Sequence, residues 1–233
     1  MIFYQLFEAE TSTYTYLLAD EMTKEAIIID SVLECVERDL KLLSEMGLKL
    51  KYIVDTHVHA DHITGAGELR NKTGAQTCIS HKANVSCVDI SLRDGDKLSF
   101  GSYSLLALET PGHTDSCISF YTDGMIFSGD VLLIRGTGRT DFQQGSPEKM
   151  FHSIQDKIYS YADQTKIYPG HDYNGFTYST VGLEKSFNKR IRSNTTFLEF
   201  QKTMSELKLA LPKKIEASVP ANMRCGKSPA QNS

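Results

Sequence analysis

Apolar and polar residues alternate in short runs over the first 30 residues of this 233-residue chain. Residues 2–7, 13–18 and 26–30 are β-prone runs separated by short polar turns, which is the pattern of strands. We therefore predict three successive strands before the first helix.

The spacing of the apolar positions then changes to that of a helix. Apolar residues recur every three or four positions over 33–46, with Ser31 as the expected N-cap and Gly47 as a left-handed C-cap. The next predicted elements are a strand, a helix and a short strand, at 51–55, 63–72 and 76–79. Strand and helix therefore alternate in this part of the chain.

Hairpins are predicted further along. Residues 116–121 and 125–127 are β-prone runs on either side of Asp123-Gly124, a pair that favours a tight turn because glycine tolerates a positive φ. Residues 148–161 have an apolar stripe at helical spacing, which predicts a helix packed on the core.

Beyond His171 the chain is mostly helical in pattern through Leu209, and it then loosens in a stretch that includes Pro220. A chain of this length with 40% hydrophobic residues is large enough for one well-buried domain. We predict an α/β domain with a core at 1–175 and a helical and loop extension at 176–233 that packs on it.

Charge and hydropathy exclude several classes of partner. The net charge of -4 and the scattered lysines and arginines give no basic surface for nucleic acid. No apolar run approaches the roughly 20 residues that a membrane helix needs. Because the chain opens directly with a strand-like segment, we expect no targeting segment and a cytoplasmic protein.

The cysteines point to the same kind of compartment. They are five in number and widely spaced, at Cys35, Cys78, Cys87, Cys117 and Cys225. This spacing argues against a disulfide framework or a cysteine zinc site, and we expect free cysteines, Cys225 included, in a reducing compartment.

The clearest chemical signal is the segment Thr56–His62, which contains His57, His59, Asp61 and His62. It follows a predicted strand, so His57 and His59 leave the strand end on the same side. Imidazole and carboxylate groups converging in this way suit Zn, Fe, Mn or Ni better than Ca or Mg.

Three more residues complete the pattern, and each follows a predicted strand at a turn that contains glycine. They are His113, Asp130 and His171, after the runs 103–109, 124–128 and 165–168. Burying so many of these groups without an ion would leave polar atoms unpaired, each costing roughly 1–3 kcal/mol. A metal site is the simpler explanation, whereas His81 and His152 are expected to be structural.

The His-x-His-x-Asp-His segment and the single His, Asp and His residues after it resemble the metallo-β-lactamase superfamily, across roughly residues 12–175. The resemblance implies a four-layer αββα sandwich with two mixed sheets. The segment Leu132–Gly145 and the ending Val219–Gly226 look like the persulfide dioxygenase branch, also called sulfur dioxygenases. Glyoxalase II, a relative by its site, carries an aromatic pair where this chain has Thr140-Asp141.

The resemblance implies one Fe(II) per chain, bound by His57, His113 and Asp130. Two imidazoles and one carboxylate leave positions for a substrate sulfur and O2, which zinc could not use for redox chemistry. It also implies supporting roles around these ligands for the remaining members of the pattern, His59, Asp61, His62 and His171.

The implied reaction oxidises glutathione persulfide with O2 and water to sulfite and glutathione. Arg139 is the leading candidate to bind a glutathione carboxylate, although it could equally brace its loop through Asp141 or backbone carbonyls. Arg190 is a further candidate for substrate binding, with a solvated helix face as the alternative. Tyr173 is the candidate for binding and catalysis at the open face of the metal, with a structural hydrogen bond as its alternative. A homodimer is also expected.

Two other functions stay open on the sequence. A binuclear zinc thioesterase of the glyoxalase II type, hydrolysing S-acylglutathione, would use all seven ligands. A non-catalytic persulfide sensor would keep the same residues without turnover.

Overall fold

The computed structural model of the protein describes residues 1–212 and 214–227. The chain forms two compact units. The first contains residues 1–92 and 97–105 and the chain from residue 211, and the second contains residues 93–96 and 106–210. The predicted boundary at residue 175 stays a prediction, and residues 213 and 228–233 of the predicted extension lie outside the described residues.

The first unit is built on a six-stranded mixed sheet. Its strand order is β1–β2–β3–β4–β5–β6, formed by Ile2–Glu8, Thr13–Ala19, Glu25–Ile29, Lys49–Val54, Gln76–Ser80 and Ile90–Leu92. The strands β1, β2 and β3 pair antiparallel, and β3 to β6 pair parallel. The predicted strands are confirmed, and β6 is an additional short strand.

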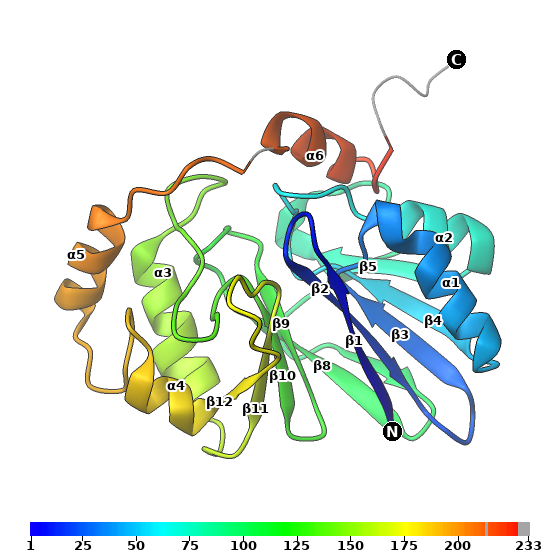
Figure 1. Cartoon of the computed structure of the whole chain (residues 1–233), viewed down its shortest axis with the longest axis horizontal. Helices are drawn as coiled ribbons and strands as arrows, with labels where there is room; N and C mark the ends of the chain where they lie inside the picture. Colours follow the sequence, from blue (N-terminus) through cyan, green and yellow to red (C-terminus); the bar gives the residue numbers. More distant parts are fainter. Residues whose placement is uncertain (213, 228–233) are drawn as a thin grey trace. The chain divides into compact units, whose positions relative to one another are not determined.

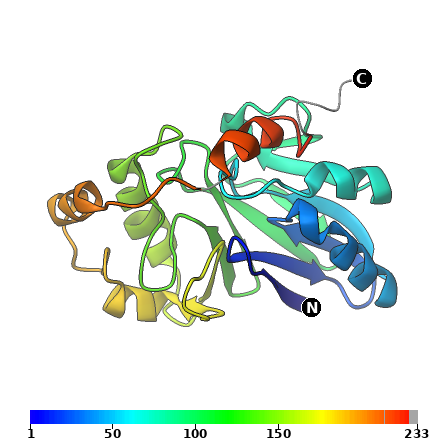
Figure 2. The ribbon, with the colours of Figure 1, turned by 45° about the horizontal axis from the view of Figure 1, so that its top comes forward.

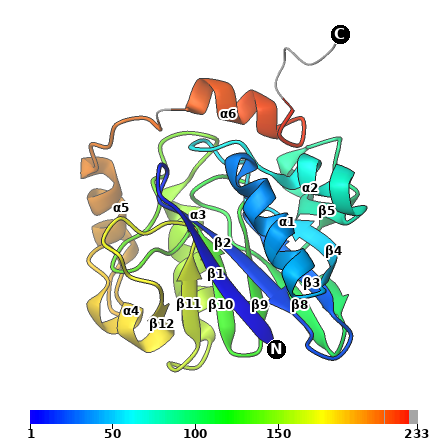
Figure 3. The ribbon, with the colours of Figure 1, turned by 45° about the vertical axis from the view of Figure 1, so that its right-hand side comes forward.

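Helices α1 (Val36–Glu45) and α2 (Ala66–Thr73) lie on one face of this sheet (Figures 1 and 3). Side chains from both helices join the apolar residues of β2, β3 and β4 in one buried cluster. The helical periodicity after residue 33 therefore reflects core packing, as predicted.

The ends of the first helical segment differ partly from the prediction. Gly47 adopts the left-handed conformation expected of it, with φ +62°. Ser31 is not the N-cap, because a 3₁₀ turn over Leu33–Cys35 precedes α1 and the residue before that turn is Val32. The Ser31 hydroxyl is buried without a hydrogen-bond partner among the described residues.

The end of the described chain is more ordered than predicted. Helix α6 spans Ile215–Asn222 and contains Pro220, where the sequence suggested a looser stretch. The cysteine prediction is also corrected there, because Cys87 and Cys225 form a disulfide with their Cα atoms 6.1 Å apart. The two cysteines are 138 residues apart in the sequence, so their spacing gave no indication that they pair.

The second sheet has the order β12–β11–β10–β9–β8–β7, with β7 at Lys97–Phe100, β8 at Tyr103–Glu109, β9 at Ile118–Thr122, β10 at Met125–Gly129, β11 at Lys166–Pro169 and β12 at Ser179–Thr180. Strands β9 and β10 form the predicted hairpin, with Thr122 opposite Met125. Because β10 and β11 run parallel, this sheet is also mixed.

Three helices of the second unit, α3 (Pro147–His152), α4 (Val181–Phe187) and α5 (Phe197–Glu206), share one face of its strands (Figure 2). The predicted helix at 148–161 is present, but a π turn and a 3₁₀ turn replace its second half. Its stripe is confirmed as core, because Met150, Ile154 and Ile158 are each 0% exposed.

Within the described ranges, no helix is both long enough and apolar enough to cross a lipid bilayer.

Candidate metal-binding residues

In the first unit, the segment Thr56–His62, called the histidine segment below, is held by Asp30, at the end of β3. Strands β3 and β4 are parallel neighbours, so the residues that follow them meet at one edge of the sheet. The Asp30 carboxylate accepts hydrogen bonds from the Thr56 backbone N–H at 2.7 Å and the Thr56 hydroxyl at 2.9 Å. It also contacts His59 Nε2 at 3.1 Å. One buried carboxylate thus organises the start of the segment.

These contacts determine which ring nitrogen of His57 carries the proton. The Thr56 hydroxyl donates to Asp30, so its oxygen is the acceptor for His57 Nδ1, which lies 2.9 Å away. Nδ1 therefore carries the hydrogen and Nε2 carries the lone pair. His57 is 1% exposed, and Nε2 is the ring nitrogen whose lone pair has the form that a metal ligand needs.

His59 lies among acidic groups. Burial alone would lower its pKa, but the charge and hydrogen bond of Asp30, with Asp55 and Asp61, raise the pKa to about 9. Burial raises the pKa of Asp55 to about 7, and the Asp30 charge adds to this effect. His59 Nδ1 is buried without a hydrogen-bond partner among the described residues. A buried orphan nitrogen of this kind fits a metal ion.

Asp61 and His62 extend this group, with Asp61 Oδ2 at 2.8 Å from His62 Nδ1. One ligand atom from each of His59, Asp61 and His62 lies within 4.8 Å of the others. The first unit alone therefore offers a three-ligand position, as well as His57.

Sequence reasoning missed Asn222, from α6. Its side-chain amide donates to the carbonyls of His59 at 2.8 Å and His62 at 2.9 Å, and its oxygen accepts from the Thr64 N–H at 2.9 Å. No local signal pointed to it, because it lies 160 residues from His62 in sequence. Asp30 was also missed, although its place at the end of a predicted strand was a usable signal.

In the second unit, His113 follows β8 and is oriented by the chain itself. Its Nδ1 lies 2.8 Å from the carbonyl oxygen of Arg139, which can only accept a hydrogen bond. Nδ1 is therefore protonated, and Nε2 carries the lone pair. Nε2 is 3.7 Å from Asp130 Oδ2, so both donors face the same space.

Asp130 and His171 follow the neighbouring strands β10 and β11, and His171 Nδ1 lies 2.7 Å from Asp130 Oδ1. Two glycines allow this packing. A Cβ on Gly138 would lie 2.2 Å from the Asp130 carbonyl oxygen and 2.9 Å from His113 Nδ1, and one on Gly170 would lie 2.8 Å from Asp130 Oδ1. The backbone therefore surrounds these residues closely.

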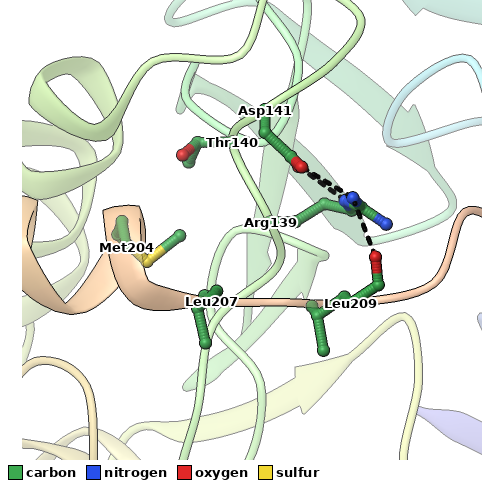
Figure 4. Close-up of a pocket in the computed structure, with 6 residues that line it drawn as sticks. All are labelled: Arg139, Thr140, Asp141, Met204, Leu207 and Leu209. Atoms are coloured by element: carbon green, nitrogen blue, oxygen red, sulfur yellow. Dashed lines mark hydrogen bonds and ion pairs between the residues drawn. The ribbon is translucent and has the colours of Figure 1, made fainter.

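Arg139 braces its own loop. Its guanidinium forms a bidentate ion pair with Asp141, each contact at 2.6 Å, and donates to the carbonyl of Leu209 (Figure 4). It also donates to the carbonyl of Ala210 at 2.7 Å. The hydrogen bond to Asp141 raises the pKa of Arg139, and the same bond lowers the pKa of Asp141. Phe142 packs beneath the cation at 4.9 Å. The bracing alternative is thus seen directly, and substrate binding stays a prediction.

The other candidates occupy different surroundings. Tyr173 is 71% exposed, and its ring stacks on His171 at 6.1 Å. Arg190 donates to the Thr137 carbonyl, and burial lowers its pKa, so it does not lie on a solvated helix face. His152 is an exposed partner of Asp156, as a structural residue would be.

Comparison with known proteins places this arrangement in a family. Residues 10–171 match the metallo-beta-lactamase superfamily. The chain belongs to that superfamily. The predicted fold class is confirmed, with two mixed sheets flanked by helices in a metallo-β-lactamase fold.

Relatives indicate the branch within the superfamily. Human mitochondrial persulfide dioxygenase ETHE1 is 47% identical over 225 residues, which cover 95% of this chain and 87% of that protein. The crystal structure of ETHE1 from Myxococcus xanthus has 46% identity and a TM-score of 0.95, covering 97% of this chain and 100% of that one. Glyoxylase B2 from Dictyostelium discoideum is 30% identical, covering 95% of this chain and 90% of that protein. The predicted relationship to the persulfide dioxygenase branch, an enzyme family, is confirmed.

Proposed function

We propose that this metallo-β-lactamase superfamily member is a persulfide dioxygenase that converts glutathione persulfide, O2 and water to glutathione and sulfite. The ligands of its single Fe(II) would be His57, His113 and Asp130. One observation carries the proposal: His57 and His113 both have Nδ1 against an oxygen that accepts its hydrogen, which places the lone pair of each ring on Nε2, the nitrogen that would bind the metal. Asp130 adds the carboxylate.

This donor set fits ferrous iron. Two imidazoles and one carboxylate on one face of an octahedral ion leave up to three positions open, so a bound Fe(II) would supply redox chemistry with room for a thiolate sulfur and O2. Neighbouring groups hold these donors. Thr56 keeps the His57 proton on Nδ1, the Arg139 carbonyl does the same for His113, and His171 contacts Asp130.

The substrate carries two carboxylates, and Arg139 and Arg190 are the proposed cations for them. A substrate carboxylate at Arg139 would compete with Asp141 for the guanidinium, because Nε and Nη2 of Arg139 already contact the Asp141 carboxylate. Asp141→Asn is therefore expected to lower the KM for the persulfide. Tyr173, exposed beside His171, is proposed to position the substrate sulfur with its hydroxyl.

O2 uptake tests the reaction. The full-length protein, loaded anaerobically with Fe(II), should consume O2 when glutathione persulfide is added and release sulfite in equal amount. His113→Ala should abolish uptake, whereas the matched surface variant His152→Ala should retain it. Failure of the iron-loaded protein to consume O2 would refute the proposal.

The rival function is supported by a specific feature of the first unit. His59, Asp61 and His62 form a second three-ligand group, and His59 Nδ1 is buried without a partner among the described residues. These residues suit a binuclear zinc thioesterase acting on S-acylglutathione. Metal analysis of protein purified without added metal distinguishes the two functions, since about one iron per chain supports oxygenation and two zinc ions with thioester hydrolysis support the rival.

The compartment and assembly belong to the same proposal. We propose a cytoplasmic homodimer that binds neither nucleic acid nor membrane. Human and bovine relatives are named as mitochondrial proteins, so cell fractionation is the test of the compartment. Sedimentation of the purified protein is the test of the dimer.

A further inference from the structure

The Cys87–Cys225 disulfide joins the loop before β6 to the chain just after α6. Both cysteines belong to the first unit. Cys225 is 6% exposed, whereas Cys87 is only half-buried, so the sulfur of Cys87 is the one that solvent can reach more easily. The remaining cysteines, Cys35, Cys78 and Cys117, are free thiols.

The chain around Cys225 packs against the residues that directly follow the histidine segment. A Cβ on Gly226 would lie 2.2 Å from the Thr64 carbonyl oxygen, and one on Gly67 would lie 2.2 Å from the Cys225 carbonyl oxygen. Three residues before Cys225, Asn222 binds the backbone of His59, His62 and Thr64. The disulfide therefore anchors the helix that supports the histidines.

A cavity of about 190 Å³ lies beside the disulfide. Its lining includes both cysteines and three cations, Arg70, Arg224 and Lys227. Arg70 pairs with Asp89 at 2.6 Å. The Arg224 and Lys227 side chains form no ion pair with any residue in 1–212 or 214–227. The cavity thus presents uncompensated positive charge next to a reducible bond.

We propose that this cavity is a docking site for small anionic thiols, which exchange with the Cys87–Cys225 disulfide and thereby release α6 from the histidine segment. A thiol bearing carboxylates is the class that fits, because Arg224 and Lys227 attract the carboxylates while its sulfur approaches Cys87. The proposal depends on neither the bound metal nor the dioxygenase reaction.

The exchange proceeds in two balanced steps. The thiolate attacks Cys87 Sγ, the electron pair of the S–S bond leaves on Cys225, and that sulfur takes a proton from water. A second thiolate then attacks the outer sulfur of the mixed disulfide, and the electron pair of that S–S bond leaves on Cys87 Sγ, which takes a proton from water. The products are the free Cys87 thiol and one molecule of oxidised thiol. The two thiols are oxidised and the protein disulfide is reduced.

Thiol exchange kinetics test the docking site. Oxidised, unfolded protein should contain three free thiols and reduced protein five, since Cys35, Cys78 and Cys117 are free. At equal thiolate concentration and low salt, reduced glutathione should open the disulfide about tenfold faster than the cationic thiol cysteamine. The double variant Arg224→Gln/Lys227→Gln should remove that preference.

The control Lys41→Gln/Lys202→Gln neutralises two lysines that are each 77% exposed and outside the cavity, and it should keep the preference. Equal rates for the two thiols, or an unchanged preference in the cavity variant, would overturn the docking site. Five free thiols in protein that has never been reduced would overturn the disulfide itself.

Hydrogen exchange tests the release of α6. The Thr64 N–H donates to Asn222, so peptides covering 59–65 should exchange faster after reduction, and Cys87→Ser should show the same increase without any thiol. Unchanged exchange in both would show that opening the disulfide does not reach the histidine segment. Since the readout needs no metal, it separates this proposal from the proposed oxygenation.

Discussion

The two units hold their metal-binding candidates by different means. In the first, buried polar side chains hold the histidine segment, with Asp30 on one side and Asn222 on the other. In the second, the backbone holds His113 and surrounds Asp130, through the Arg139 carbonyl and the close approach of Gly138. The first unit should therefore be sensitive to the loss of a polar group, and the second to the addition of a methyl group.

This difference follows from where the residues lie along the chain. Thr56–His62 is one continuous segment, so a few carboxylate and amide contacts position several ligands together. His113, Asp130 and His171 come from three separate strand ends, and their spacing depends on how closely the neighbouring turns pack. Steric fit is therefore a constraint there in addition to the hydrogen bonds of His113 and His171.

The largest effect is expected from Asp30→Ala. The variant removes the buried carboxylate that contacts the Thr56 N–H, the Thr56 hydroxyl and His59. All three groups then lose this hydrogen-bond acceptor in the protein interior. Breaking a buried charged contact in this way costs about 3–5 kcal/mol. We expect a loss of that size in the free energy of unfolding, measured by urea denaturation monitored by circular dichroism.

Asp156→Ala is the matched control, because Asp156 is an exposed partner of His152 with a side chain that is 67% exposed. Its unfolding free energy should change by less than about 0.5 kcal/mol. Similar losses in the two variants would show that Asp30 does not organise the histidine segment.

Gly138→Ala should have the next largest effect, and it tests the second unit. The added methyl group would overlap the Asp130 carbonyl oxygen and press on His113, so the loop has to shift. Overpacking of this kind costs about 1–3 kcal/mol, and displaced ligands lower metal affinity by about 10–100-fold. Chelator competition measures the affinity.

Gly136→Ala, in the same loop, is the control, since its Cβ would meet only Arg190 Nε, at 4.0 Å. It should leave metal affinity unchanged. A comparable loss of affinity in both variants would indicate general sensitivity of the loop rather than steric fit around Asp130 and His113.

The sequence predicted most of this architecture for a clear reason. Apolar residues recur at the spacing of a strand or a helix because one face of the element is buried. Met150, Ile154 and Ile158 are an example, since they recur at helical spacing and are all buried. The candidate ligands were visible because chemically specific residues follow strands at turns. The ring nitrogen that carries the proton could not be predicted, since in His113 it is determined by the Arg139 carbonyl, 26 residues away in the sequence.

What the sequence could not predict depends on distant contacts. Nothing local to Cys87 or Cys225 indicates their pairing, and nothing local to Asn222 indicates its contacts with His59 and His62. Ser31 was a plausible cap by residue type, but the 3₁₀ turn placed the helix start beyond it. The disulfide and the Asn222 contacts join residues far apart in the sequence, whereas the Ser31 prediction was wrong because of a local 3₁₀ turn.

The smallest effect on stability, and the sharpest on the proposed site, is expected from Thr56→Val. This variant removes the hydroxyl that links Asp30 to His57 Nδ1, so the histidine loses the acceptor that holds its proton away from Nε2. Metal affinity should fall about 10–100-fold, with an unfolding cost of about 1 kcal/mol. Thr15→Val is the matched control, because the buried Thr15 hydroxyl donates at 2.7 Å to the backbone carbonyl of Asp30 and not to the His57 link. That variant should lose similar stability and keep its metal affinity. Equal affinities in the two variants, by chelator competition, would mean that the hydroxyl does not set the protonation of His57.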